Sequence, residues 1–224
     1  MAIEIFTFGD REIKLFMTKK HRFGTDAMLL ADFANVRHKD VVCDFCTGCG
    51  IIPVLILRKY APRFILGLDI MEEAAEIFGR TIAENDLANV ASLCADLREL
   101  PKNLPESLPH SFDVITCNPP YKAAGAGIVS ESDSEKAARH ETQCGINDVC
   151  RAAKKMLRSG GRLVLCNRPE RLADVICAMR ENGIEPKRLK FVSKTPETPP
   201  WLFLLEGRKD GGSFLSVESG VFIK

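Results

Sequence analysis

The segment Asn118-Pro119-Pro120-Tyr121 is the part of the chain whose residue types are most specific for chemistry. The amide of Asn118 offers an acceptor and a donor, and the two prolines lock the backbone so that the carbonyl of Pro119 is able to accept. The ring of Tyr121 offers a flat stacking surface. A planar NH₂ group that donates both protons to these acceptors directs its nitrogen lone pair toward an electrophile. The segment therefore predicts group transfer to a planar amine.

A glycine-containing turn predicts the site of the second reactant. Gly48 and Gly50 allow backbone amides to approach a ligand closely, and the helix that follows directs its amino end at that ligand. Asp69 stands some 19 residues after Gly50, a spacing typical of a carboxylate that binds ribose hydroxyls. Asp96 is placed to accept from an exocyclic amine. The turn has only G-x-G, whereas a nicotinamide site favours G-x-G-x-x-G, and it lacks the Gly-Lys-Ser/Thr ending of a Walker loop.

Alternating strands and helices from residue 40 onward would position these segments. Four consecutive strands end in polar or special residues, which a parallel sheet collects at one edge. The pattern predicts an α/β fold, a Rossmann-like, doubly wound, mostly parallel seven-stranded sheet with a reversed edge strand. The expected strands span 41–45, 64–68, 90–94, 113–117, 162–166, 187–193 and 201–206, and the expected helices span 51–60, 71–85, 146–157 and 169–182.

The first 35 residues have a different pattern. Apolar residues on both sides of Gly9-Asp10 predict a hairpin, and Thr25-Asp26 can cap a helix that follows. We expect residues 1–35 to form an appendage that packs against a domain spanning 36–224.

Composition limits the classes of protein to consider. The 224 residues carry 31 basic and 30 acidic side chains, a net charge of +1, so a polyanion partner would have to meet a local basic patch. We expect no signal peptide and no membrane span, and a cytoplasmic location in which the nine cysteines stay reduced.

The C-x-x-C-x-x-C spacing of Cys43, Cys46 and Cys49 raises metal ligation as an alternative. We predict no metal site, because Cys43 falls in an apolar strand and the other two in the turn.

Taken together, the D-x-x-T-G-x-G turn, Asp69 and the NPPY segment resemble the class I amino-methyltransferases that use S-adenosylmethionine. More narrowly, the chain resembles the bacterial tRNA adenine-N6 methyltransferases that modify an adenine beside the anticodon of a valine tRNA. The narrower resemblance covers about residues 5–212 and rests on segments in the same order: FGTDAMLLADF, GIIPVL, ARHE, LRSGGRLVL, RPERL and LLEGRKDGG.

The resemblance implies a cofactor, a mechanism and a set of site residues. S-adenosylmethionine would be the cofactor, and the reaction would be in-line displacement at the sulfonium methyl. The implied cofactor residues are Asp44, Thr47, Gly48 and Gly50 for the methionine part, Asp69 for the ribose, Asp96 and Leu97 for the adenine, and Thr25, Asp26 and Asn118 around the pocket. The implied catalytic segment is Asn118, Pro119, Pro120 and Tyr121, with Tyr121 stacked on the base.

A tRNA substrate implies basic side chains near the mouth of the pocket. The candidates for RNA contact are Lys19, Lys20, Arg22, Arg139, His140, Arg208 and Lys209. Each has an ordinary alternative, a solvated surface or a salt bridge within a loop. One position departs from the family, because Cys46 stands where many relatives have glycine. A cysteine there is strained if the backbone has positive φ.

Other functions remain open from the sequence. The NPPY segment also suits a protein-glutamine N5 methyltransferase of the release-factor class or an rRNA guanine-N2 methyltransferase. The glutamine enzymes usually carry a helical domain before the glycine turn, and only about 43 residues precede Asp44 here. A non-catalytic cofactor-binding partner subunit is the third alternative, against which the intact turn and NPPY segment argue. We expect a monomer, with a small homo-oligomer as the alternative.

Overall fold

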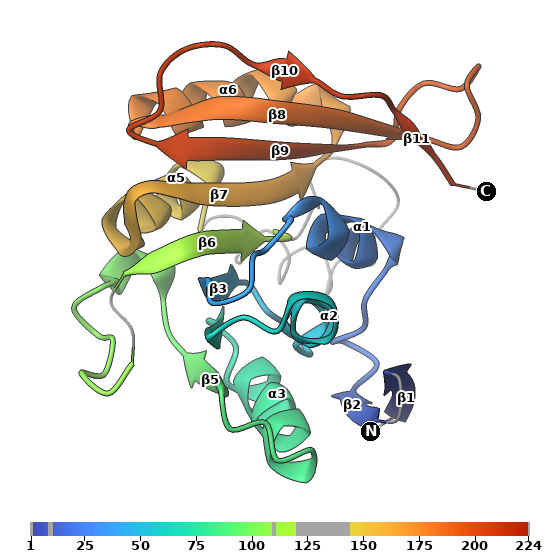
Figure 1. Cartoon of the computed structure of the whole chain (residues 1–224), viewed down its shortest axis with the longest axis vertical. Helices are drawn as coiled ribbons and strands as arrows, with labels where there is room; N and C mark the ends of the chain where they lie inside the picture. The colour runs from blue at the N-terminus through green and yellow to red at the C-terminus, as the bar shows by residue number, and fades with distance from the viewer. Residues whose placement is uncertain (1, 9–10, 109–110, 120–143, 224) are drawn as a thin grey trace, which may run out of the picture.

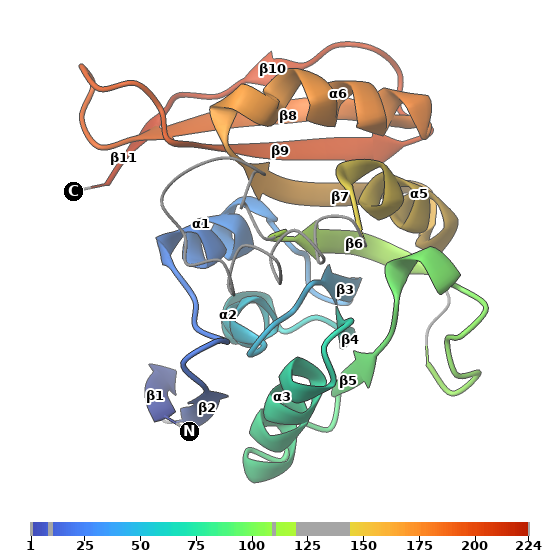
Figure 2. The same cartoon turned by 180° about the vertical axis from the view of Figure 1, so that it is seen from behind.

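The computed structural model describes residues 2–8, 11–108, 111–119 and 144–223, and Figures 1 and 2 show it from opposite sides. Its strands are β1 (Ala2–Phe8), β2 (Arg11–Met17), β3 (Val41–Phe45), β4 (Phe64–Asp69), β5 (Val90–Cys94), β6 (Phe112–Cys117), β7 (Leu157–Asn167), β8 (Ile184–Ser193), β9 (Leu202–Lys209), β10 (Ser216–Val217) and β11 (Val221–Phe222). Its helices are α1 (Thr25–Phe33), α2 (Ile51–Tyr60), α3 (Glu72–Glu84), η1 (Leu97–Glu99), α5 (Ile146–Met156), η2 (Pro169–Arg171) and α6 (Leu172–Glu181).

The central sheet confirms the predicted α/β class. Its order is β10-β8-β9-β7-β6-β3-β4-β5, with β11 also paired to β8, and the five strands from β3 to β7 are parallel to their neighbours among themselves. Two details differ from the sequence prediction. The reversed strand is β9, which lies between β7 and β8 rather than at the edge, because the crossover through α6 places β8 one position away from β7 and β9 fills the gap. The short β10 and β11 pair with the outer side of β8, so the described sheet has nine strands instead of seven.

Alternation along the strands produces a core on each face of the sheet. On one face Val42, Val114 and Val164 pack in a cluster with α1, α2 and α3. On the other face Phe45 and Leu165 pack in a cluster with α5 and α6. Helix α6 lies behind β8 and β9 in Figure 1 and in front of them in Figure 2. The doubly wound arrangement is therefore the one that the sequence predicts.

The N-terminal hairpin forms as predicted, with β1 and β2 paired antiparallel. It is fixed to α3, because the Phe16 amide donates to Thr81 Oγ1 at 3.1 Å and Asn85 bonds both the amide and the carbonyl of Lys14. Leu15 is buried in the same apolar cluster as α1 and α2. The hairpin and α1 thus share a core with the sheet, and a boundary at residue 35 remains a prediction.

One strand is longer than the sequence predicts. The pattern indicated a strand at 162–166, and β7 begins at Leu157, where it pairs with Phe112 of β6. Gly160 lies inside the strand with φ of +73°, and a shift of register follows between Phe112 and Val114. In the described ranges no helix has the length and apolar character needed to cross a membrane.

Candidate active site

The carboxyl ends of four adjacent strands define the candidate site. Asp44 lies near the end of β3, Asp69 ends β4, Asp96 follows β5 and Asn118 follows β6. The strands stand in the order β6-β3-β4-β5, so these polar residues share one edge of the sheet. The sequence predicted this gathering, and the topology produces it.

The turn between β3 and α2 depends on two glycines with positive φ, +55° at Gly48 and +81° at Gly50. A Cβ at Gly50 would lie 1.9 Å from the ring of Phe78 on α3, whereas a Cβ at Gly48 would meet nothing within 4 Å. Gly50 is therefore required by packing as well as by backbone conformation. The backbone of the turn is tied to β4, because the amide of Thr47 donates to the carbonyl of Leu68 at 2.9 Å.

Cys46 shows the strain that its position suggested. Its φ is +57°, the left-handed region in which a residue with a Cβ costs about 1–2 kcal/mol. The neighbouring thiol of Cys117 is fully buried, and a hydrogen bond with Cys46, together with burial, raises the pKa of Cys117 well above its ordinary value.

The described part of the chain contains no group of three or more His, Cys, Asp or Glu side chains arranged to hold a metal ion.

Asp44 is the most unusual charged group of the edge. Its side chain is fully buried, and Oδ1 accepts from the hydroxyl of Thr116 at 2.6 Å. Burial raises the pKa of Asp44 to about 7, with the bond from Thr116 acting in the opposite direction and the charge of Asp69 adding to the rise. Asp44 Oδ2 and the buried Oγ1 of Thr47 have no well-aligned hydrogen bond among the described residues, although the Thr47 hydroxyl is close enough to Asp44 to lower its pKa as well. A cationic donor beside these two atoms would satisfy both.

Asp69 is held for binding by backbone amides. Its Oδ2 accepts from the amide of Gly48 at 2.9 Å and its Oδ1 from the amide of Met71 at 3.0 Å. Each carboxylate oxygen has capacity for more than one donor. The two amides therefore fix the carboxylate while leaving it able to accept from hydroxyl groups.

Asp96 has a partner that the sequence reasoning missed. It caps η1 by accepting from the amide of Arg98 at 2.9 Å, and both carboxylate oxygens also accept from the Arg98 guanidinium. The Arg98 side chain is the main reason that the pKa of Asp96 is lowered. The Asp-x-Arg spacing across a short turn was the available signal. A ligand amine at Asp96 would share the carboxylate with Arg98, and the buried Leu97 follows at the first position of η1.

Asn118 is held by side chains from two distant elements. Its Nδ2 donates to Asp26 Oδ2 at 3.0 Å, and its Oδ1 accepts from the Cys166 thiol at 3.2 Å. Gly24 is the N-cap residue of α1 and no side chain caps the helix, so Thr25 and Asp26 lie in its first turn and do not cap it as predicted. The structure brings Asp26 to Asn118. Cys166 was missed by the sequence reasoning, although it lies at the carboxyl end of the next parallel strand. Pro119 is half-buried beside Asn118.

The candidates for RNA contact separate into three groups. Exposed Lys19, Lys20 and Arg22 follow β2, and Lys20 Nζ lies 3.6 Å from Glu73 at the start of α3, near the edge where β4 ends. The second group, Arg139 and His140, lies outside the described residues. So do Pro120 and Tyr121 of the NPPY segment.

Arg208 and Lys209 lie at the opposite end of the sheet, so the expectation that they surround the mouth of the site is wrong. Strand β9 is antiparallel to β7, and its carboxyl end therefore meets the amino ends of the parallel strands. There Arg208 Nε donates to the carbonyl of Gly160 at 3.1 Å, and Lys209 Nζ donates to the carbonyl of Leu157 at 2.6 Å. These two cations stabilise the start of β7.

A family model described as "Methyltransferase small domain" matches residues 12–181, which is more than half of the chain. The chain belongs to the methyltransferase small domain family. A protein of Parabacteroides distasonis named tRNA1(Val) (adenine(37)-N6)-methyltransferase is 27% identical over 188 residues, 83% of this chain and 76% of the relative. A protein of the same name from Porphyromonas gingivalis is 26% identical over 218 residues, 93% of this chain and 82% of the relative.

Solved structures of methyltransferases share the fold of this methyltransferase. A predicted O-methyltransferase from Agrobacterium tumefaciens superposes with a TM-score of 0.69, at 21% identity, over 88% of this chain and 86% of the other. A geranyl diphosphate C-methyltransferase from Streptomyces coelicolor, solved with S-adenosyl-L-homocysteine, has a TM-score of 0.58 at 14% identity, over 83% and 80% of the two chains. The expected Rossmann-like fold and the expected class, an S-adenosylmethionine-dependent methyltransferase, are confirmed.

The residues of this edge fit S-adenosylmethionine, the cofactor of the class. The buried Oδ2 of Asp44 and Oγ1 of Thr47 suit the ammonium group of its methionine part. The open space beside Gly48 allows a ligand to approach the backbone, and the fixed carboxylate of Asp69 suits ribose hydroxyls.

Proposed function

We propose that this methyltransferase transfers a methyl group from S-adenosylmethionine to the N6 amino group of adenine in RNA, with a tRNA near its anticodon as the substrate. The observation that carries the proposal is the position of Asn118. Its amide is bonded to Asp26 at the end of β6, and β6 pairs with β3, which carries the buried Asp44. A planar amine and a cationic cofactor would therefore meet at neighbouring strand ends. The names of the relatives from Parabacteroides distasonis and Porphyromonas gingivalis support the choice of tRNA adenine.

The residues act by binding and orientation. When bound, the cofactor supplies a methyl group on a positively charged sulfur. The oxygen of Asn118 and the carbonyl of Pro119 would accept the two protons of the adenine amine, so that the nitrogen lone pair points along the line of attack. Proximity and alignment account for most of the acceleration of such a displacement. An adenine in an anticodon loop is already outside a duplex and does not have to be unpaired.

The test is transfer of a labelled methyl group to total tRNA, followed by nucleoside analysis. We expect N6-methyladenosine. Labelling of a release-factor peptide without any labelled tRNA would instead assign the chain to the glutamine branch, and labelled guanine in rRNA would assign it to the rRNA branch.

Asn118→Ala tests the site. It removes one acceptor of the amine, so we expect kcat to fall at least a hundredfold, while the dissociation constant of S-adenosylhomocysteine stays within about threefold. Normal turnover by this variant would refute the placement of the amine at Asn118.

A further inference from the structure

The amide of Asn118 is held at both ends by side chains that are remote in the sequence. Asp26 Oδ2 lies 3.0 Å from Nδ2 and belongs to the first turn of α1, at a separation of 92 residues. Cys166 Sγ lies 3.2 Å from Oδ1 and belongs to β7, at a separation of 48 residues. Cys166 is fully buried. The fold thus brings three elements together at one side chain.

The hydrogen-bonding capacities of these two partners fix which way the amide faces. An ionised carboxylate can only accept, so Asp26 pairs favourably with the NH₂ group of Asn118 and unfavourably with its oxygen. A thiol is a weak donor, which suits the oxygen on the other side. Turning the amide over would place oxygen against carboxylate. Asp26 and Cys166 therefore favour a single orientation of the amide.

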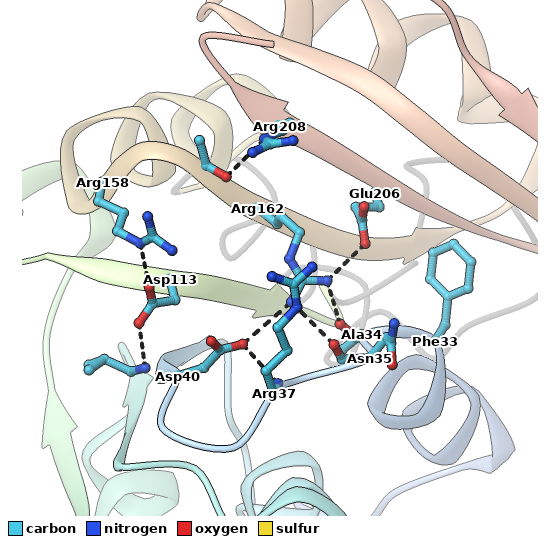
Figure 3. Close-up of polar contacts among 12 residues, drawn as sticks. Phe33, Ala34, Asn35, Arg37, Asp40, Asp113, Arg158, Arg162, Glu206 and Arg208 are labelled. Carbon is cyan, nitrogen blue, oxygen red and sulfur yellow. Dashed lines mark hydrogen bonds and ion pairs between the residues drawn. The ribbon is translucent and has the colours of Figure 1, made fainter.

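The helix that carries Asp26 is anchored to the sheet at its other end. Arg162 of β7 donates to the carbonyls of Ala34 at 3.0 Å and Asn35 at 3.2 Å, just after α1 ends, as Figure 3 shows. Glu206 of β9 accepts from the same guanidinium at 3.1 Å. These bonds tie the backbone just after the end of α1 to β7. Because α1 has only nine residues, this anchor also fixes Asp26 relative to the strands.

We infer that Asp26 and Cys166 are positioning residues, which hold the oxygen of Asn118 toward the amine that is methylated. This inference rests on the proposed function. The carboxylate of Asp26 polarises the amide through Nδ2 and makes Oδ1 a stronger acceptor. An amide oxygen has two lone pairs, so it can accept from Cys166 and from a substrate amine together.

Steady-state kinetics with S-adenosylmethionine and tRNA test the inference. We expect Asp26→Ala to lower kcat about ten- to a hundredfold, with the KM for tRNA and the dissociation constant of S-adenosylhomocysteine changed less than threefold. Asp26→Asn keeps an acceptor for Nδ2, and Cys166→Ser keeps a donor for Oδ1, so each recovers most of the kcat that its alanine counterpart loses. Cys150→Ser, at a buried cysteine of α5, is the matched control with unchanged kcat.

Two outcomes of the kinetics overturn the inference. In the first, Asp26→Ala weakens S-adenosylhomocysteine binding while kcat stays unchanged, which would make Asp26 a residue that closes the cofactor pocket. In the second, Asp26→Asn and Cys166→Ser lose as much kcat as the alanine variants. Thermal unfolding of each variant separates loss of the fold from loss of positioning.

A measurement without substrate separates this inference from the proposed function. The side-chain NH₂ resonance of Asn118, identified by its loss in Asn118→Asp, reports the bond to Asp26 in the free protein. In the wild-type protein we expect one NH₂ proton of Asn118 to be shifted downfield and protected from exchange with solvent. In Asp26→Ala its chemical shift and exchange rate should return to ordinary values, whereas in Cys150→Ser they should stay as in the wild type. If this change occurs and tRNA is not methylated, the proposed function fails and the positioning stands. If Asp26→Ala leaves the resonance unchanged, the positioning fails whatever the substrate is.

Discussion

The proposed pairing of Asp44 with the ammonium group of the cofactor predicts that cofactor binding depends on pH in the range where Asp44 titrates. Burial raises the pKa of Asp44 to about 7, so below that pH the side chain is mostly protonated in the free protein. Only the ionised form pairs with the ammonium group of S-adenosylhomocysteine. That ammonium belongs to an amino acid with a free carboxylate, which makes it more basic than a peptide N-terminus, so it stays charged at pH 7.0 and below. Lowering the pH from 7.0 to 5.5 therefore perturbs Asp44 and leaves the ligand's charge unchanged.

The magnitude follows from the ionised fraction. With a pKa of about 7, the fraction is about one half at pH 7.0 and about 0.03 at pH 5.5. The apparent dissociation constant equals the intrinsic one divided by the competent fraction, so the affinity should weaken about sixteenfold over this range. Binding near pH 6 should release about 0.9 proton from Asp44.

Isothermal titration calorimetry with S-adenosylhomocysteine measures both quantities. Titrations at several pH values give the affinity, and two buffers of different ionisation enthalpy give the number of protons released. Asp44→Asn should bind weakly with no dependence on pH between 5.5 and 7.0, whereas the control Asp210→Asn, at the far end of the sheet, should keep the sixteenfold dependence. A wild-type affinity that is flat over this range, or a dependence that survives in Asp44→Asn, would refute the pairing of Asp44 with the ammonium.

Two predictions concern stability in urea unfolding. Gly50→Ala should lower the free energy of unfolding by about 3 kcal/mol or more, because the new methyl group meets the ring of Phe78 at 1.9 Å and the backbone is left-handed there. The control Gly79→Ala, in open space on α3, should raise the free energy of unfolding by about 0.5–1 kcal/mol. Equal effects of the two substitutions would contradict the packing of the turn. Glu206→Gln should lower the free energy of unfolding by about 2–3 kcal/mol, because the buried carboxylate accepts from Arg162 and Arg188. The control Glu218→Gln, at a more exposed carboxylate, should lower it by at most about 1 kcal/mol. A loss below about 0.5 kcal/mol at Glu206 would show that its bonds to the two arginines contribute little to stability.

Local patterns predicted the parts of the site that are built from backbone. The glycine turn, the helix after it and Asp69 follow from a continuous stretch of about thirty residues. In the structure their contacts are equally local: the amide of Gly48 donates to Asp69 Oδ2, and the turn is tied to the adjacent strand β4. Periodicity and turn chemistry carry that kind of information.

The parts that depend on tertiary register were not predictable from the sequence. The resemblance placed Asp26 at the pocket, yet its bond to Asn118 arises from the packing of α1 across the sheet. The sequence indicated only that Cys166 is a buried thiol in a strand. The residues next to it in the sequence do not indicate that Asn118 lies beside it at the end of that strand. Arg208 was placed at the mouth by its charge alone, and the reversal of β9 decides that it lies at the opposite end.

This difference has a consequence for how each half of the site responds to substitution. The turn proposed to bind the cofactor is held by backbone bonds and glycine conformations, which accommodate Cys46 at φ of +57°. The proposed amine site is held by side chains, because Asn118 bonds to a carboxylate of α1 and a thiol of β7. A change of side chain at Asp26 or Cys166 therefore acts directly on alignment, to which displacement reactions are most sensitive. Substitutions in the N-terminal segment should accordingly affect turnover more than they affect cofactor affinity.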